Sequence, residues 1–231
     1  MTLKTNPTNQ EALPRPESTL PLQYIAQLDQ LEALFDPLTE AVVWSRKLPH
    51  GIQNWLAAFH TSAFPEGSFV LKSVDAAAFI MDTFEATGVS RSPMLSWFSQ
   101  DVAHLTHCVT DIMETPYVRL RLEAVSDDAC RRFHIDNVKA RLICTYRGPG
   151  TQIITTSDKP EDIETIPTGM PVLLKGKLWP EACDLSLKHR SPPIAGTGVC
   201  RLVLVLEGVH HEDIHPIYDQ LYSSQRGVRH G

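Results

Sequence analysis

The second half of the sequence is a series of short apolar runs that turn residues interrupt. These short runs favour β-strands, and they read "YVRLRLEAV", "ARLICTY", "MPVLLKGKLW", "SLKH" and "RLVLVLEG". Turn signals such as "YRGPGT", "IPTG" and "SPPIAGTG" separate them. Several short strands at this spacing are typical of a β-sandwich or a β-barrel. We therefore expect residues 116–210 to form an all-β core.

Residues 22–115 have a different pattern and predict a mainly helical part. A first helix is expected where apolar residues recur at helical spacing: Leu22, Ile25, Leu28, Leu31 and Leu34. Three further helices are expected in "GIQNWLAAFHTSAF", in "SVDAAAFIMDTFEATG" and in "SPMLSWFSQDVAHLTHCVTDIMET". Gly88 is a plausible end for the third helix, and Ser92 before Pro93 is a good start for the fourth. The fold class is therefore α+β.

The ends of the chain differ in composition from the rest. Residues 1–21 carry four prolines and no apolar core segment, which predicts a disordered leader and not a signal peptide. Residues 221–231 are expected to form a flexible tail. Nothing resembles a linker between the two halves, so residues 22–220 are expected to form a single domain.

Composition narrows the partners that this chain can have. The 231 residues include 21 basic and 27 acidic side chains, a formal net charge of −6, which disfavours binding to nucleic acid or to an anionic membrane. The five cysteines include no C-x-x-C pair, which fits reduced thiols in a cytoplasmic protein. No apolar run approaches the length of a membrane-spanning helix. A small-molecule or peptide substrate is the partner class that remains.

The triplet "HID" contains the pair of side chains most suggestive of chemistry. In a strand, residues two apart point to the same side, so His134 and Asp136 would project together. The pair supplies one nitrogen and one carboxylate oxygen. Ferrous iron with open coordination positions is held by two histidines and one carboxylate. A third ligand would have to come from elsewhere in the chain.

His189 is the best candidate for the third ligand, because it follows Asp136 by 53 residues and several strands can intervene. The alternative for His189 is a surface histidine at a strand end. Arg201 opens the run "RLVLVLEG", whose apolar residues on both faces predict a strand buried on both sides. A buried arginine needs an anion beside it. That anion is either a protein carboxylate or the carboxylate of a small acid cofactor.

These residues, in this order, resemble the iron(II)- and 2-oxoglutarate-dependent dioxygenases. The family pattern is H-x-D, a distal histidine several strands later, and an arginine that opens the last core strand. "HIDN" followed by "RLICTY" is similar to the prolyl hydroxylase branch. "FHIDNVKARLICTYRGPGT" with "HRSPPIAGTGVCRLVLVL" resembles a bacterial family of unknown function within the superfamily. The resemblance covers roughly residues 117–208 and implies a double-stranded β-helix, or jelly roll.

The resemblance also implies roles for individual residues. His134, Asp136 and His189 would bind Fe(II) as the catalytic centre, and Arg201 would bind the distal carboxylate of 2-oxoglutarate. Tyr146 stands where relatives often place a cosubstrate contact, and an unbroken strand from residue 134 would give it the parity of the metal ligands; the alternative is a core or rim tyrosine.

Two neighbouring arginines are treated differently from Arg201. Arg141 has the opposite parity in an unbroken strand and is left out of the predicted site. Arg190 is adjacent to His189, so it is interpreted as a structural or substrate-side residue. Neither is therefore expected to contact the metal ligands.

Three other interpretations remain open. A non-catalytic jelly roll that handles or senses zinc or iron would use the same ligands without 2-oxoglutarate. His104 and Cys108, four apart on one predicted helix face with His107 nearby, form a rival zinc site, although such residues commonly lie in a helix core. A β-domain without chemistry could serve as an interaction module. No G-x-S-x-G elbow or G-K-[ST] loop is present.

Overall fold

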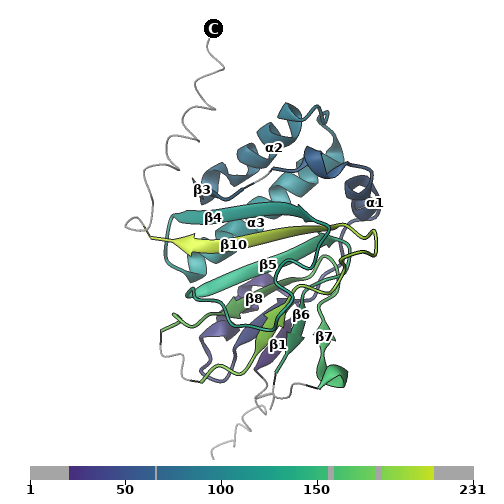
Figure 1. Ribbon diagram of the computed structural model, residues 1–231. Helices are drawn as coiled ribbons and strands as arrows, with labels where there is room; N and C mark the ends of the chain where they lie inside the picture. The colour runs from purple at the N-terminus through teal and green to yellow at the C-terminus, as the bar shows by residue number, and fades with distance from the viewer. Residues whose placement is uncertain (1–20, 66, 156–158, 181–183, 211–231) are drawn as a thin grey trace, which may run out of the picture.

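A seven-stranded sheet forms the centre of the molecule (Figure 1). The computed structural model describes residues 21–65, 67–155, 159–180 and 184–210. Across the sheet, the strands follow the order β1 (Leu22–Ile25), β2 (Ala41–Trp44), β8 (Pro171–Lys175), β5 (Ala140–Arg147), β10 (Arg201–Val209), β4 (Tyr117–Val125) and β3 (Phe69–Lys72). All neighbouring pairs are antiparallel except β1 and β2.

A second, smaller sheet completes the β-structure. It consists of β7 (Glu164–Thr165), β6 (Gln152–Ile154) and β9 (Lys188–Arg190), and an isolated bridge joins His134 to His189 at its edge. The two sheets enclose an apolar layer that contains Ile143, Ile153, Val203 and Val205. The protein is thus an α+β fold with a double-stranded β-helix core, as the sequence predicts.

The helices cover the other face of the large sheet. The α-helices are α1 (Ile52–Ala57), α2 (Ala76–Ala86) and α3 (Pro93–Ile112), and the short 3₁₀ helices are η1 (Leu28–Phe35), η2 (Thr61–Ala63), η3 (Ser73–Asp75) and η4 (Pro160–Asp162). In Figure 1, α3 runs behind β4, β10 and β5. Among the described helices, none has both the length and the apolar character needed to cross a membrane.

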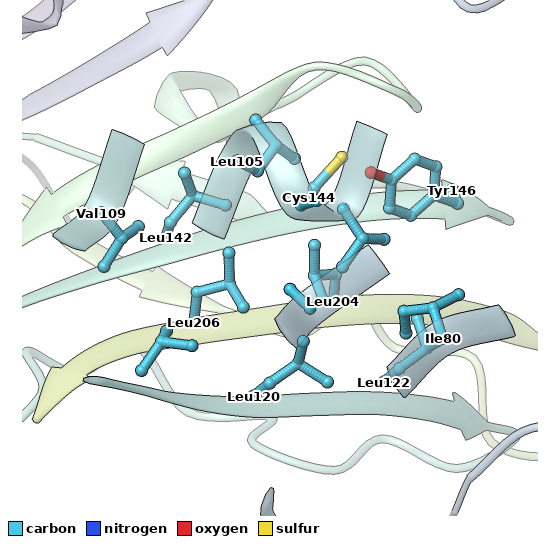
Figure 2. Packing of buried hydrophobic residues seen from close by; sticks show 14 of the residues in the cluster. Ile80, Leu105, Val109, Leu120, Leu122, Leu142, Cys144, Tyr146, Leu204 and Leu206 are labelled. Carbon is cyan, nitrogen blue, oxygen red and sulfur yellow. The ribbon is translucent and has the colours of Figure 1, made fainter. Parts of the chain in front are cut away.

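The main hydrophobic core lies between these helices and the large sheet (Figure 2). Strand β10 shows how one strand serves two layers. Leu202, Leu204 and Leu206 point into the helical side, whereas Val203 and Val205 point into the space between the sheets. Because side chains alternate along a strand, Arg201 shares the second face with the two valines. β10 is buried on both sides, which confirms the expectation for "RLVLVLEG".

The long fourth helix is confirmed at its predicted start. Ser92 caps α3, and its side-chain oxygen accepts a hydrogen bond from the backbone N–H of Leu95 at 3.1 Å. Gly88 follows α2 with a positive φ of 85°, as expected of a residue that ends a helix. All five predicted strands are present, while the short strands β6 and β7 were not predicted.

The first predicted helix is wrong. Residues 22–34 form strand β1 and the 3₁₀ helix η1, because Leu22 to Ile25 pair in parallel with β2 along the edge of the large sheet. β1, β2 and β3 all belong to this sheet, so residues 22–115 are not a separate helical layer. Residues 1–20 and 211–231, which include most of the predicted leader and the tail, lie outside the described residues.

Candidate metal centre

His134 and His189 face each other across an antiparallel bridge at the edge of the small sheet. The backbone N–H of His134 donates to the carbonyl of His189 at 3.1 Å, and the reverse bond measures 3.0 Å. The two imidazole rings lie 4.5 Å apart, centroid to centroid. Pairing of these backbones therefore brings together two histidines that are 55 residues apart in the sequence.

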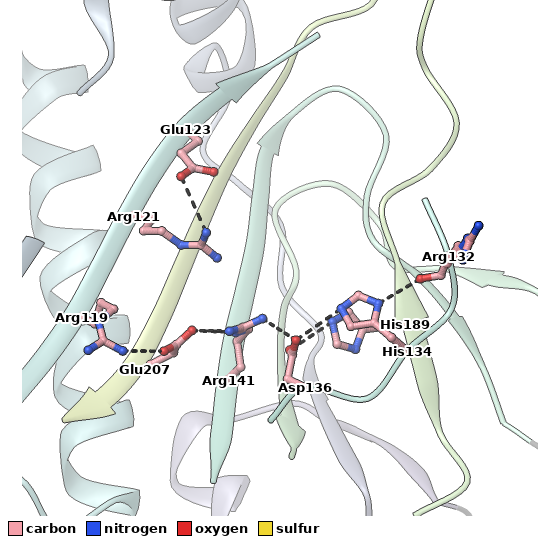
Figure 3. A network of polar contacts seen from close by, with 9 residues as sticks. All are labelled: Arg119, Arg121, Glu123, Arg132, His134, Asp136, Arg141, His189 and Glu207. Atoms are coloured by element: carbon pink, nitrogen blue, oxygen red, sulfur yellow. Dashed lines mark hydrogen bonds and ion pairs between the residues drawn. The ribbon is translucent and has the colours of Figure 1, made fainter. Parts of the chain in front are cut away.

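Asp136 lies beside both imidazoles (Figure 3). Its Oδ1 is 3.3 Å from Nε2 of His134, and its Oδ2 is 3.2 Å from Nε2 of His189. One ligand atom from each of the three side chains lies within 4.8 Å of the others. The structure thus brings together all three residues that the sequence analysis assigned to a metal.

The orientation of His134 favours ligation through Nε2. Its Nδ1 lies 2.9 Å from the carbonyl oxygen of Arg132. A carbonyl only accepts, so Nδ1 carries the proton and the Nε2 lone pair is left free toward Asp136. A metal-binding histidine usually donates its other ring N–H to a carbonyl or carboxylate in this way.

The Asp136 carboxylate is held in its charged form. Burial raises the pKa of this carboxyl, but the adjacent His189, Arg141 and His134 lower it by more, so its pKa lies below the ordinary value. The side chain is only 9% exposed. Metal binding needs a deprotonated carboxylate, and this environment provides one at neutral pH.

An unsatisfied atom tests whether a cation fits here. Oδ2 of Asp136 is buried and has no hydrogen-bond partner among the described residues, although Nε2 of His189 lies 3.2 Å away. A buried carboxylate oxygen without a donor is costly. A divalent cation between Oδ2 and the two Nε2 atoms would satisfy it. Two imidazoles and one carboxylate form a donor set that suits ferrous iron.

Arg201 is a buried cation that lines the same cavity as His134 and His189. The residue is 2% exposed, and its side chain donates to the carbonyl of Pro149 at 2.7 Å and to Oγ1 of Thr145 at 3.2 Å. No carboxylate of the described residues forms an ion pair with it. Burial lowers the pKa of Arg201 to about 10, so it is still charged at neutral pH. Thus no carboxylate of the described residues is the anionic partner that a buried Arg201 was expected to have.

His134, His189 and Arg201 line one cavity of about 150 Å³ between the two sheets. The cavity wall also includes Thr151, directly before β6, and Val203 from β10. A buried guanidinium that no described carboxylate pairs with, in a cavity beside a metal-type triad, suits a small acid that also reaches a metal ion.

Arg141 and Glu207 belong to the site but were not predicted. Arg141 contacts Oδ1 of Asp136 at 2.5 Å, and its Nε donates to Oε1 of Glu207 at 2.9 Å. The prediction that Arg141 points away from Asp136 is wrong, because the chain bends at residues 137–139, before β5 begins. A signal for Glu207 was available, since it is the only charged residue within "LVLVLEG".

The same bend removes Tyr146 from the cavity. Tyr146 is fully buried on the helical side of the sheet, where its ring packs on Phe98. Its hydroxyl donates to Oδ2 of Asp101 at 2.5 Å, and Asp101 also pairs with Arg46. The expected cosubstrate contact of Tyr146 is therefore replaced by the alternative, a core tyrosine.

The structure also gives the positions of Arg190 and of the residues of the rival zinc site on α3. The guanidinium of Arg190 stacks 4.4 Å above the ring of Phe133 and lines the cavity, in agreement with a structural or substrate-side role. His104 is exposed on α3 and Cys108 is partly buried, and burial raises the pKa of the Cys108 thiol to about 11. Within the described residues, the triad of His134, Asp136 and His189 is the only group of three side chains arranged to hold a metal, so the rival site on α3 is not formed.

Comparisons with known proteins agree with this architecture. The model of a family described as protein of unknown function (DUF1826) matches residues 26–207. A search of curated proteins gave no match. The dioxygenase for auxin oxidation 1 from Arabidopsis thaliana, solved as a complex with 2-oxoglutarate, is similar in structure with a TM-score of 0.51 and 10% identity. The alignment covers 87% of this chain and 97% of that one.

Two further solved structures are more distant. A prolyl-4-hydroxylase from Pseudomonas putida aligns with a TM-score of 0.34 and 12% identity, over 72% of this chain and 97% of that chain. A full-length protein from Neurospora crassa, solved in complex with alpha-KG, aligns with a TM-score of 0.40 and 11% identity, over 87% of this chain and 88% of that chain. At these identities, the likeness concerns the fold.

Proposed function

This chain belongs to the DUF1826 family, and we propose that it is an Fe(II)- and 2-oxoglutarate-dependent oxygenase. His134, Asp136 and His189 would hold the ferrous ion, and Arg201 would bind the distal carboxylate of 2-oxoglutarate. The observation that carries the proposal is the buried guanidinium of Arg201, which forms no ion pair with any described carboxylate and lines the same cavity as His134 and His189. A metal-binding protein without a cosubstrate has no need of that cation.

The chemistry of this class supplies the oxidising power from the metal and the cosubstrate. Oxygen and 2-oxoglutarate are consumed, succinate and carbon dioxide are released, and a C–H bond of the substrate becomes C–OH. The residues of the protein position the reactants and exclude water. Thr145 and the carbonyl of Pro149 contribute by holding the Arg201 guanidinium in one orientation.

The proposal is tested by titrating the apoprotein anaerobically with Fe(II) and then with 2-oxoglutarate. We expect stoichiometric Fe(II) binding, followed by a weak visible charge-transfer band when the keto acid is added. Asp136→Ala is expected to abolish Fe(II) binding. Arg201→Met is expected to bind Fe(II) normally but to lose roughly 10- to 100-fold in affinity for 2-oxoglutarate, since a charge-assisted pair is removed.

Arg121→Met serves as the matched control, because Arg121 lines the same cavity but is 34% exposed and lies beside Glu123. Its affinity for 2-oxoglutarate should stay close to that of the wild type. Fe(II) uptake without the visible band would favour the alternative of a non-catalytic metal-binding jelly roll. Unchanged Fe(II) affinity in Asp136→Ala would show that the metal site is misassigned.

A further inference from the structure

A row of four alternating charges leads from the surface of β4 to the metal triad (Figure 3). Arg119 contacts Oε2 of Glu207 at 3.3 Å, and Glu207 accepts from Nε of Arg141 at 2.9 Å. Nη1 of Arg141 lies 2.5 Å from Oδ1 of Asp136. The row comes from three adjacent strands of the large sheet and ends on a predicted metal ligand.

The position of Arg141 is fixed from both sides. Its side chain is 18% exposed, and those of Asp136 and Glu207 are each 9% exposed. Glu207 lies on β10 with its backbone in the middle of the sheet, so it cannot follow Arg141 into another position. Moving Arg141 away would leave the nearly buried carboxylate of Asp136 without its guanidinium, and that of Glu207 with the more exposed Arg119 as its described cation, which is unfavourable.

Because of Arg141, the two carboxylate oxygens of Asp136 have different surroundings. Oδ1 is occupied by the guanidinium, while Oδ2 is buried and accepts no hydrogen bond within the described chain. We propose that Arg141 is a positioning residue that restricts Asp136 to binding the metal through Oδ2 alone. This inference rests on the proposed iron site and adds to it the residue that sets how the carboxylate binds.

The consequence concerns the coordination positions that remain open. A carboxylate that binds through both oxygens occupies one position more than a carboxylate that binds through one. Two histidines and a single carboxylate oxygen leave open positions for ligands that are not part of the protein. By holding Oδ1, Arg141 preserves a position that the cosubstrate or another ligand needs.

Loss of Arg141 would have two separate effects on the bound ion, one on its affinity and one on its open coordination positions, so the positioning role can be measured. Removing the positive charge of Arg141 would strengthen the binding of a divalent cation through electrostatics alone. Releasing Oδ1 would reduce the number of open positions on that cation. The number of water molecules on the bound ion therefore reports the positioning role, whereas metal affinity by itself does not.

The experiment uses Mn(II) bound to the whole chain and measures water-proton relaxation, without any turnover. In Arg141→Met, the relaxation enhancement per bound ion is expected to fall by roughly a third, because Oδ1 would take one of three open positions. Arg141→Lys, which retains a donor for Oδ1, should recover most of the enhancement. Arg121→Met, an arginine lost from the same cavity, should match the wild type.

The outcomes separate this inference from the proposed function. If the wild type binds Mn(II) and Arg141→Met gives the same enhancement per ion, Arg141 does not set the binding mode, although the metal site stands. A lysine variant as low as the methionine variant would contradict donation to Oδ1 as the cause. If the wild type fails to bind Mn(II), the proposed metal site and this inference fall together.

A second variant covers the case in which Arg141→Met does not fold. Arg141→Met/Glu207→Gln also removes the buried acid that would otherwise lose a partner, and the same reduction of about a third is expected. Loss of Mn(II) binding in both variants, with the wild type intact, would show that Arg141 supports the fold and would overturn the inference.

Discussion

Single buried charges are used in two different ways in this protein. On the helical side of the large sheet, Arg46 and Asp101 form a buried ion pair that Tyr146 completes with its hydroxyl. On the other side, Arg201 is also buried but has only neutral partners among the described residues. The first cluster is satisfied internally, whereas the second has no described protein anion, as the proposed binding of 2-oxoglutarate requires.

Tyr146→Phe tests this division at one residue. The variant removes a hydrogen bond to a buried carboxylate, so we expect the free energy of unfolding to fall by about 1–3 kcal/mol in urea denaturation. Affinity for 2-oxoglutarate should be unchanged, because Tyr146 lies on the opposite face of the sheet from the cavity. A large loss of that affinity in a stable, folded variant would return Tyr146 to the cosubstrate site.

At the scale of elements, the turn after β5 holds Arg201 in place. Gly148 has a φ of 77°, and a Cβ there would lie 2.9 Å from the carbonyl oxygen of Cys200 and 3.0 Å from Cγ of Arg201. The neighbouring Pro149 carbonyl accepts a hydrogen bond from Nε of Arg201. This glycine is therefore required by close packing as well as by backbone conformation.

Gly148→Ala should displace Arg201 and weaken binding of 2-oxoglutarate. Gly196→Ala is the matched control, since Gly196 has a φ of 75° but no atom within 4 Å of an added Cβ. Both variants carry a backbone penalty of about 1–2 kcal/mol, so the difference between them isolates the contact with Arg201. Titration with 2-oxoglutarate gives the measurement, and equal affinities in the two variants would exclude a role for the turn in positioning Arg201.

At the scale of the whole molecule, the candidate site takes residues from both sheets. The proposed metal ligands come from the segment before β5 and from β9, and Arg201 comes from β10, so binding would connect chain segments that separate on unfolding. A ligand that binds only the folded state stabilises it by mass action. Metal and cosubstrate should therefore raise the melting temperature.

A ligand present at 100 times its dissociation constant stabilises the folded state by about 2.7 kcal/mol. For a chain of this size, each of the two ligands, Mn(II) and 2-oxoglutarate, should raise the melting temperature by roughly 5–11 °C at that excess. Differential scanning calorimetry without oxygen measures the shift. The same shift in Asp136→Ala would place the binding of these ligands elsewhere in the molecule.

The sequence by itself determined most of the local elements and pointed to the three side chains that the structure brings together. Helix α3 is specified by its cap at Ser92 and by an apolar face, and β10 by an apolar run buried on both sides. The two-residue spacing pairs His134 with Asp136, and His189 and Arg201 follow as candidates from their place in the chain. The resemblance to a known family added the roles of these residues. Capping and periodicity act over a few residues, so they can be predicted without the fold.

Only the tertiary structure decided which side chains share the cavity. The bend at residues 137–139 reverses the parity of β5, which brings Arg141 to Asp136 and sends Tyr146 into the helical core. Residues 22–25 have helical spacing, yet they form a strand because pairing with β2 satisfies their backbone at the edge of the sheet. Such outcomes depend on partners distant in sequence, and a local pattern carries no information about those partners.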